Sequence, residues 1–177
     1  MKQLIREIIP VIIGILVALV INNWNEDRKE KKYLNQIFTS IEKELEISRK
    51  DLEKNIPKEQ ILIDSIGKYL NDATVSIFEI IRKADGIYGA NVKNSSWKAI
   101  ANSKIELVDF EKLSALSEIN ESKESLELKR EKQLDFMINN LKASDQEKKE
   151  IFMLLNQEIL STEKYLLLEF EEFLKKY

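Results

Sequence analysis

Apolar and polar positions divide the first 29 residues into two contrasting runs. From Ile8 to Ile21 no side chain is charged, and 11 of these 14 residues are Ile, Leu or Val. They cover every face of a helix, whereas a core helix of a soluble protein keeps a polar face. After Trp24 a dense cluster of charged residues begins. This pattern predicts a helix with apolar surroundings on all sides.

The apolar run predicts an uncleaved membrane anchor. Counted to Trp24 it has 17 residues, or about 25 Å of helix against a hydrocarbon core about 30 Å thick. Its aliphatic side chains contribute roughly −3 to −7 kcal/mol on a membrane-insertion scale. Tryptophan favours the membrane–water interface, so the helix should leave the lipid there. We expect residues 1–26 to be the anchor and its interfacial exit, bound to the lipid bilayer, and residues 27–177 to be a body outside the membrane.

A cleaved signal peptide and a buried core helix are the alternatives. A signal peptide has an apolar region of this length, but "ALVINNWNED" offers no small-residue cleavage pattern after Ala18. A core helix is disfavoured because the run has no polar face. We therefore interpret the run as an anchor.

Small and polar residues of the anchor suit contact with a second membrane helix. Gly14 and Ala18 are four residues apart on one helical face, where small side chains let helices approach closely. Asparagine amides can hydrogen-bond between membrane helices, although simple anchoring at the interface also explains them. The expected membrane-interface or helix–helix contact residues are Gly14, Ala18, Asn22, Asn23, Trp24 and Asn25.

Helical periodicity continues into the body. Six positions follow alternating spacings of four and three, the pattern of a heptad seam with one polar interruption. They are Leu34, Phe38, Ile41, Leu45, Ser48 and Leu52. No helix breaker occurs between residues 22 and 56, so the anchor should continue into a stalk with coiled-coil character. Pro57 is expected to end that helix and begin another.

Later segments predict more helices. We expect a second helical stretch that carries Ile61 to Ile81 and is either continuous or broken at Asn71–Asp72. We also expect a short helix through Ala101 with Trp97 on its buried side, and a helix over residues 110–141 with Asp109 as its cap. Ser144 should cap the last helix as part of a capping box. The stretch 120–132 is so polar that it should project into solvent or fray. The predicted fold is all-α: a transmembrane helix continuing into a stalk and a four-helix-like antiparallel bundle.

Composition excludes several function classes. The chain of 177 residues contains neither cysteine nor histidine, which removes the thiol nucleophile, the thiolate metal site and the commonest general base and metal ligand. Basic and acidic residues, 28 and 31, are mixed along the chain, so no basic face suits nucleic acid. We expect no enzyme activity, no catalytic residue, no metal site and no cofactor.

One spacing resembles a catalytic motif. Ser95 and Lys98 have the S-x-x-K spacing of serine acyl-enzymes, which places nucleophile and amine one helical turn apart. The companion motifs are missing, so a helix cap beside an exposed lysine is the simpler interpretation. Solvated helical faces likewise explain the many paired carboxylates.

The stretch "IIGILVALVINNWNEDRKEKKYL", residues 12–34, resembles the start of a family of Bacteroidota single-pass membrane proteins that is defined only as a domain of unknown function. Members look like "VVIGILIALQINNWNE-RK" followed by a helical body. A second similarity lies at residues 95–119, with Ser103–Lys104 where the family has Ser-Gly. The resemblance implies a bacterial inner-membrane protein with a periplasmic body, and it transfers no catalytic residue.

Charge alone favours the opposite orientation. Arg28, Lys29, Lys31 and Lys32 follow the run, whereas Lys2 and Arg6 precede it, and basic residues favour the cytoplasmic side. We follow the resemblance and expect a periplasmic body.

Three functions stay open at this point. The leading one is an accessory, scaffold or interaction subunit of a bacterial envelope complex, either a homo-oligomer or bound to another membrane protein. The second is a ligand-sensing helical body that signals through a membrane partner. The third, a membrane-bound hydrolase, is disfavoured by the missing histidine and cysteine.

Overall fold

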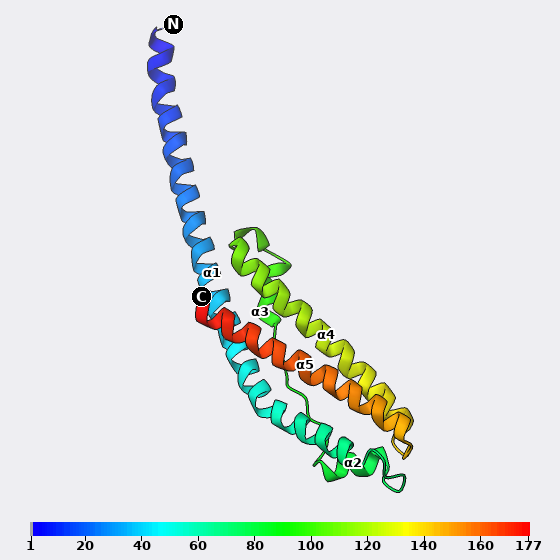
Figure 1. Cartoon of the computed structure of the whole chain (residues 1–177). Helices are drawn as coiled ribbons and strands as arrows, with labels where there is room; N and C mark the ends of the chain where they lie inside the picture. Colours follow the sequence, from blue (N-terminus) through cyan, green and yellow to red (C-terminus); the bar gives the residue numbers. More distant parts are fainter. Residues whose placement is uncertain (1) are drawn as a thin grey trace.

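The computed structural model describes the backbone of residues 2–177 and the side chains of residues 9–177. This part of the chain holds five α-helices, one 3-10 turn and no strand (Figure 1). The elements are α1 (Lys2–Lys68), α2 (Ile77–Lys83), α3 (Ser95–Ala101), η1 (Ile105–Leu107), α4 (Phe110–Asn140) and α5 (Gln146–Lys176). The predicted all-α fold, a long N-terminal helix continuing into a helical bundle, is confirmed.

Helix α1 runs without a break through Pro57, so the prediction that this proline ends the helix was wrong. A proline inside a helix costs about 3 kcal/mol, because it removes one backbone hydrogen bond and crowds the preceding turn. Leu52, Leu62 and Ile66 lie on either side of it and are fully buried in the body. Burying each such side chain contributes roughly 1.5–3 kcal/mol, which together outweighs the penalty.

Three long helices form the body, not the four predicted. Helix α5 packs along both α1 and α4 and runs antiparallel to them (Figure 1). In place of a fourth helix, the chain returns toward the anchor as an irregular segment, residues 85–94, followed by α3. We call residues 85–94 the return segment.

Side chains of α1 hold the return segment in place. Because it is not helical, its backbone N–H groups need other partners. Two of its N–H groups donate to α1 side chains: Asn91 to Asp51 at 2.7 Å and Lys93 to Ser48 Oγ at 2.9 Å. At the start of α3, the Ser96 N–H donates to Glu44 at 3.1 Å. Ser48, the polar interruption in the predicted heptad seam, is therefore an acceptor for the return segment.

The apolar residues of the body form two clusters. The proximal core, nearer the anchor, contains Ile41, Leu45, Leu52, Trp97, Ile100, Leu116, Leu126, Ile159, Leu166, Phe170 and Phe173. The distal core contains Leu62, Ile66, Ile77, Ile80, Ala84 and Phe152. The buried apolar residues of the predicted seam thus pack against the chain's own helices. Trp97 is buried, as predicted.

Two local predictions need correction. The polar stretch 120–132 neither projects nor frays, because Lys123 and Leu126 are buried within a continuous α4. Asp145, not Ser144, caps α5, accepting from the Lys148 N–H at 3.1 Å. A carboxylate there also interacts favourably with the partial positive charge of the helix N-terminus. The predicted Asp109 cap of α4 is confirmed by its bond from the Glu111 N–H at 3.0 Å.

Phe170→Ala and Leu168→Ala on α5 test the position of the proximal core. Phe170 is fully buried and Leu168 is 56% exposed. We expect Phe170→Ala to lower the free energy of unfolding by about 3–5 kcal/mol through the cavity it leaves, and Leu168→Ala by about 0.5 kcal/mol or less. Chemical unfolding of the full chain in detergent micelles, followed by circular dichroism, measures both. Equal effects would contradict the packing of α5 described here.

Candidate functional site

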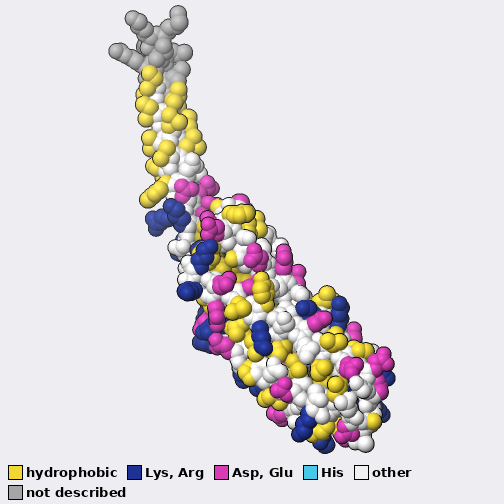
Figure 2. Space-filling model, viewed as in Figure 1, with side chains coloured by type: hydrophobic (Ala, Val, Ile, Leu, Met, Phe, Trp, Pro, Cys, Tyr) yellow, Lys and Arg dark blue, Asp and Glu magenta, His cyan; other side chains and the backbone are white. Residues whose placement is uncertain are grey.

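The anchor part of α1 stands clear of the body. Among the residues that the structure describes, one helix, α1, is long and apolar enough to cross a membrane. Its large apolar side chains from Ile9 to Ile21 are 48–67% exposed, and Figure 2 shows apolar atoms along this stretch with no other element covering them. The anchor therefore offers its whole circumference to whatever surrounds it.

The helix brings four of the six predicted contact residues onto one face. At about 100° per residue, Gly14, Ala18, Asn22 and Asn25 fall within a sector of about 80°. Asn23 and Trp24 lie outside this sector, about 140° and 120° from its centre. A Cβ added to Gly14 would meet no atom within 4 Å, so this face is open in the monomer. We call these four residues the anchor stripe.

The anchor stripe points away from the body. Glu30, Ile37 and Ile41, which lie on the body side of α1, are centred about 130° from the stripe on an ideal helix. Two anchors can therefore pair through the stripe without bringing their bodies into collision.

A buried polar layer separates the two cores of the body. It comprises Asn55 and Glu59 on α1, Gln133 on α4, and Asn156, Thr162 and Glu163 on α5, each at most 9% exposed. Arg130 on α4 joins the layer with its guanidinium. Buried polar groups need partners, and the Gln133 amide donates to Asn156 Oδ1 at 2.7 Å.

Glu163 lies at the centre of this layer. Its Oε1 accepts from the Arg130 guanidinium and from the Ala90 N–H, the latter at 3.3 Å. Arg130 Nη1 also donates to the Ala90 carbonyl at 2.6 Å. The guanidinium lies over Gly89, where an added Cβ would come within 3.2 Å of it. One carboxylate thus connects α5, α4 and the return segment.

Glu59 reaches the same carboxylate from α1. Burial raises the pKa of Glu59 from 4.5 to about 8; the charge of Glu163 adds to this and the Arg130 guanidinium opposes it. Burial also raises the pKa of Glu163, opposed by Arg130 and by the Ala90 N–H. Glu59 Oε2 and Glu163 Oε2 are buried and have no other partner among the described side chains. A proton held by Glu59 removes the repulsion between the two carboxylates, and interaction with the Glu163 side chain favours this protonated form by raising the pKa of Glu59.

The sequence contained a signal for this pair that the pattern analysis missed. The seam of α1 continues as Leu52, Asn55, Glu59, Leu62 and Ile66, still at spacings of three and four. Glu163 occupies the equivalent place between Ile159 and Leu166 on α5. Polar residues in core positions of two helices indicate a buried polar layer.

The predicted chemistry of α3 has no site around it. Ser95 and Lys98 are both exposed, and the buried serine of this helix is Ser96, which donates to Glu44 at 3.0 Å. Within the described residues, no group of three carboxylates is arranged to hold a metal ion.

Comparisons with protein-family models, with curated proteins and with solved structures gave no match.

The raised pKa of Glu59 predicts a dependence of stability on pH. The folded chain keeps a proton that the unfolded chain has lost, so the free energy of unfolding falls as pH rises from 4.5 to about 8. One proton gives a slope of at most about 1.4 kcal/mol per pH unit. Glu59→Gln, which is neutral at every pH, should flatten this slope. Glu158→Gln, at an exposed position of α5, should leave it unchanged. A slope unchanged by Glu59→Gln would contradict the assignment.

The anchor stripe predicts a face-specific cross-link. Because the chain has no cysteine, Ala18→Cys and Leu16→Cys each introduce a single thiol. Ala18 is in the stripe, and Leu16 is about 160° away on the helix. We expect oxidation in membranes to give a disulfide-linked dimer for Ala18→Cys, and at least several-fold less for Leu16→Cys. Equal cross-linking at both positions, or none at either, would count against a homo-oligomer through the stripe.

Proposed function

We propose that this protein is a non-enzymatic, single-pass membrane protein that acts by binding, as an accessory, scaffold or interaction subunit of a bacterial envelope complex. The observation that carries the proposal is the continuity of α1. Its first part is apolar and uncovered on every side, and its second part supplies one wall of the body's core.

The uncovered apolar surface supports the membrane part of the proposal. Each Ile, Leu or Val left in water forgoes about 1.5–3 kcal/mol of burial. No element of the described chain covers these side chains, so the lipid bilayer or other membrane helices would do so. A single span is the simplest arrangement, because the rest of the described chain is folded into the body.

The short distance between anchor and body supports a role at the membrane surface. Contacts with the body begin at Glu30, whose carboxylate accepts from Lys104 Nζ at 3.1 Å. Glu30 is six residues beyond Trp24, or about 9 Å along the helix. The body is thus held close to the bilayer, where it meets partners that are themselves in the membrane.

Binding through the anchor stripe accounts for an oligomer better than the stalk does. The heptad seam is occupied by the chain's own helices, whereas the stripe is open and faces away from the body. A second copy of this chain or another membrane helix fits there by close approach and asparagine hydrogen bonds.

The resemblance to Bacteroidota membrane proteins supports the bacterial inner membrane and a periplasmic body. The four basic residues directly after the apolar run favour the opposite orientation. A measurement of topology is therefore part of the test.

Ligand sensing is the second candidate function. A hollow of about 350 Å³ lies between the start of α4 and the end of α5, lined among others by Phe110, Glu118, Glu169 and Lys176. A small molecule that raises the melting temperature of the full chain in a saturable way would favour this function.

Two lysines in the anchor test the proposal. Leu16→Lys with Val17→Lys adds about 5–7 kcal/mol to the cost of insertion, enough to offset the aliphatic contribution. We expect the chain to resist carbonate extraction from membranes and the double variant to be extracted. Leu154→Lys with Leu168→Lys, at positions of α5 that are 57% and 56% exposed, is the matched control and should stay in the membrane.

A reporter active only in the periplasm, fused after Tyr177, completes the design. Reporter activity with the intact anchor supports a periplasmic body. A membrane-bound but inactive fusion would place the body in the cytoplasm. Extraction of the unmodified chain by carbonate would overturn the membrane anchor itself.

A further inference from the structure

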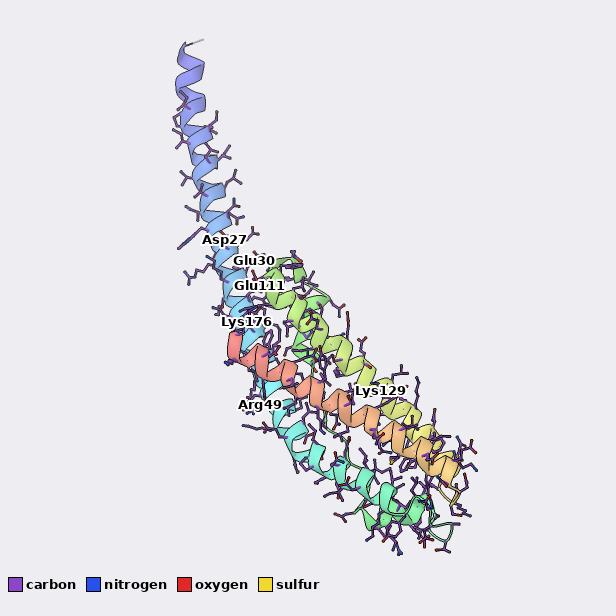
Figure 3. All side chains as sticks on the ribbon, viewed as in Figure 1. Asp27, Glu30, Arg49, Glu111, Lys129 and Lys176 are labelled. Atoms are coloured by element: carbon purple, nitrogen blue, oxygen red, sulfur yellow. The ribbon has the colours of Figure 1, made fainter. Side chains whose placement is uncertain are left out.

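The connection between α3 and α4 forms the end of the body nearest the anchor. We call residues 102–110, which include η1, the tip. The tip is fixed to α1 by the Lys104–Glu30 ion pair at 3.1 Å and by the hydrogen bond between Tyr33 and Ser103 at 3.3 Å. In Figure 3 the start of α4, marked by Glu111, lies at the level of Glu30 on α1. The tip therefore lies at the membrane-facing end of the body.

The tip exposes large apolar side chains in an ordered backbone. Phe110 is 79% exposed, the highest value among the large apolar residues that the structure describes, and Ile105 is 40% exposed. Between them Val108 is buried, and its N–H donates to the Ile105 carbonyl at 3.0 Å. Asp109 caps α4 directly before Phe110. The two exposed side chains are thus presented on a fixed framework, and Figure 2 shows apolar atoms at this end of the body.

The register of α1 places the tip near lipid headgroups. Glu30 lies about 9 Å beyond Trp24 along the helix. The interfacial layer on each side of the hydrocarbon core is about 5–8 Å thick. Transmembrane helices tilt by about 20° on average, and a tilt toward the body lowers the tip by several ångströms more. An aromatic side chain at that height reaches the headgroup region.

We propose that the tip is a second membrane contact, at which Phe110 and Ile105 enter the interface of the same bilayer that α1 crosses. The inference rests on the proposed function, because it requires the anchor to span that bilayer. The anchor and the tip together fix the direction in which α1 tilts and the side of the body that faces the membrane.

The charges of the tip identify the kind of contact. Within the tip Lys104 is basic and Glu106 and Asp109 are acidic, and the next two residues, Glu111 and Lys112, have opposite charges, so the tip carries no excess of positive charge. Attraction to anionic lipids therefore does not drive the contact. The contact is driven by apolar burial and by the preference of aromatic rings for the membrane interface. Both act equally with zwitterionic and anionic bilayers.

Single-cysteine variants of the full chain test the proposal by spin-label depth. The chain has no cysteine of its own, so Phe110→Cys, Val17→Cys and Ser161→Cys each carry one nitroxide. Val17 lies within the anchor, and Ser161 is exposed on α5 away from the tip. The full chain is reconstituted into phosphatidylcholine vesicles, with and without phosphatidylglycerol. Collision rates of each label with oxygen and with a polar nickel chelate report its depth.

We expect the ratio of oxygen to nickel collision rates at position 110 to be several-fold higher than at position 161 and lower than at position 17. The ratio at position 110 should be the same in both kinds of vesicle. A deep label at 17 with a water-exposed label at 110 overturns the second contact while the anchor stands. A water-exposed label at 17 overturns the proposed function itself. Depth at 110 only in anionic vesicles, or protection from both reagents by a protein contact, also overturns the inference.

A second variant tests whether the tip itself inserts, or whether the apolar nitroxide label alone draws position 110 into the membrane. With the nitroxide placed by Ile105→Cys, Phe110→Ser removes the most exposed apolar side chain of the tip. We expect the oxygen-to-nickel ratio at position 105 to fall at least twofold. Leu128→Ser, at a 52%-exposed position of α4, is the control and should leave the ratio unchanged. An unchanged ratio in Phe110→Ser contradicts insertion through Phe110.

Discussion

One buried carboxylate, that of Glu163, determines how the parts of the body are joined. It accepts from Arg130 on α4 and from the backbone of the return segment, and it faces Glu59 on α1. A charge taken out of water is tolerated only where such partners surround it. Shifting any of these elements along its neighbour would leave a charge buried without a partner. The apolar cores on either side lack this directionality, because aliphatic side chains pack in many registers. The polar layer therefore specifies the alignment of the helices, and the two cores supply most of the stability.

The same alignment links the body to the apolar first part of α1. Glu59 belongs to the helix that begins in the apolar run, so the anchor and the polar layer share one rigid element. Asp51 and Ser48 hold the return segment to that helix, and Glu44 holds the start of α3. From there α3 leads to the tip beside Glu30. The position of the tip relative to the membrane thus follows from contacts made far along the body. The proposed binding function at a membrane requires such a connection, because the body must then present a constant face to its partners.

The sequence predicted those features that depend on local composition. The long uncovered apolar helix, the Asp109 cap and the all-α class follow from residue types within a few turns. The prediction for Pro57 was wrong because its penalty is local, whereas the burial that outweighs it comes from contacts with α2 and with the more distant α5. The prediction that residues 120–132 project or fray was wrong for a similar reason. Packing against α5 decides which of their few apolar side chains are covered, and the sequence alone does not reveal this packing. Glu59 and Glu163 were visible as polar residues in a seam, but their pairing required the fold. The exposure of Phe110 at the end of the body nearest the anchor could not be predicted, because it depends on the register in which α3 packs on α1.

A continuous helix between anchor and body also fixes the direction, around the helix axis, in which the body extends. Each residue of α1 turns the chain by about 100° and advances it by about 1.5 Å. The four residues 26–29, between the stripe and the first contact with the body at Glu30, therefore set the angle between the anchor stripe and the side from which the body extends. Adding one residue there would swing the body by more than a quarter turn about the membrane normal while hardly changing its height. Adding seven would nearly restore the angle and lift the body by about 10 Å. In this segment the number of residues matters as much as their identity, because it determines the direction in which the body extends from the anchor.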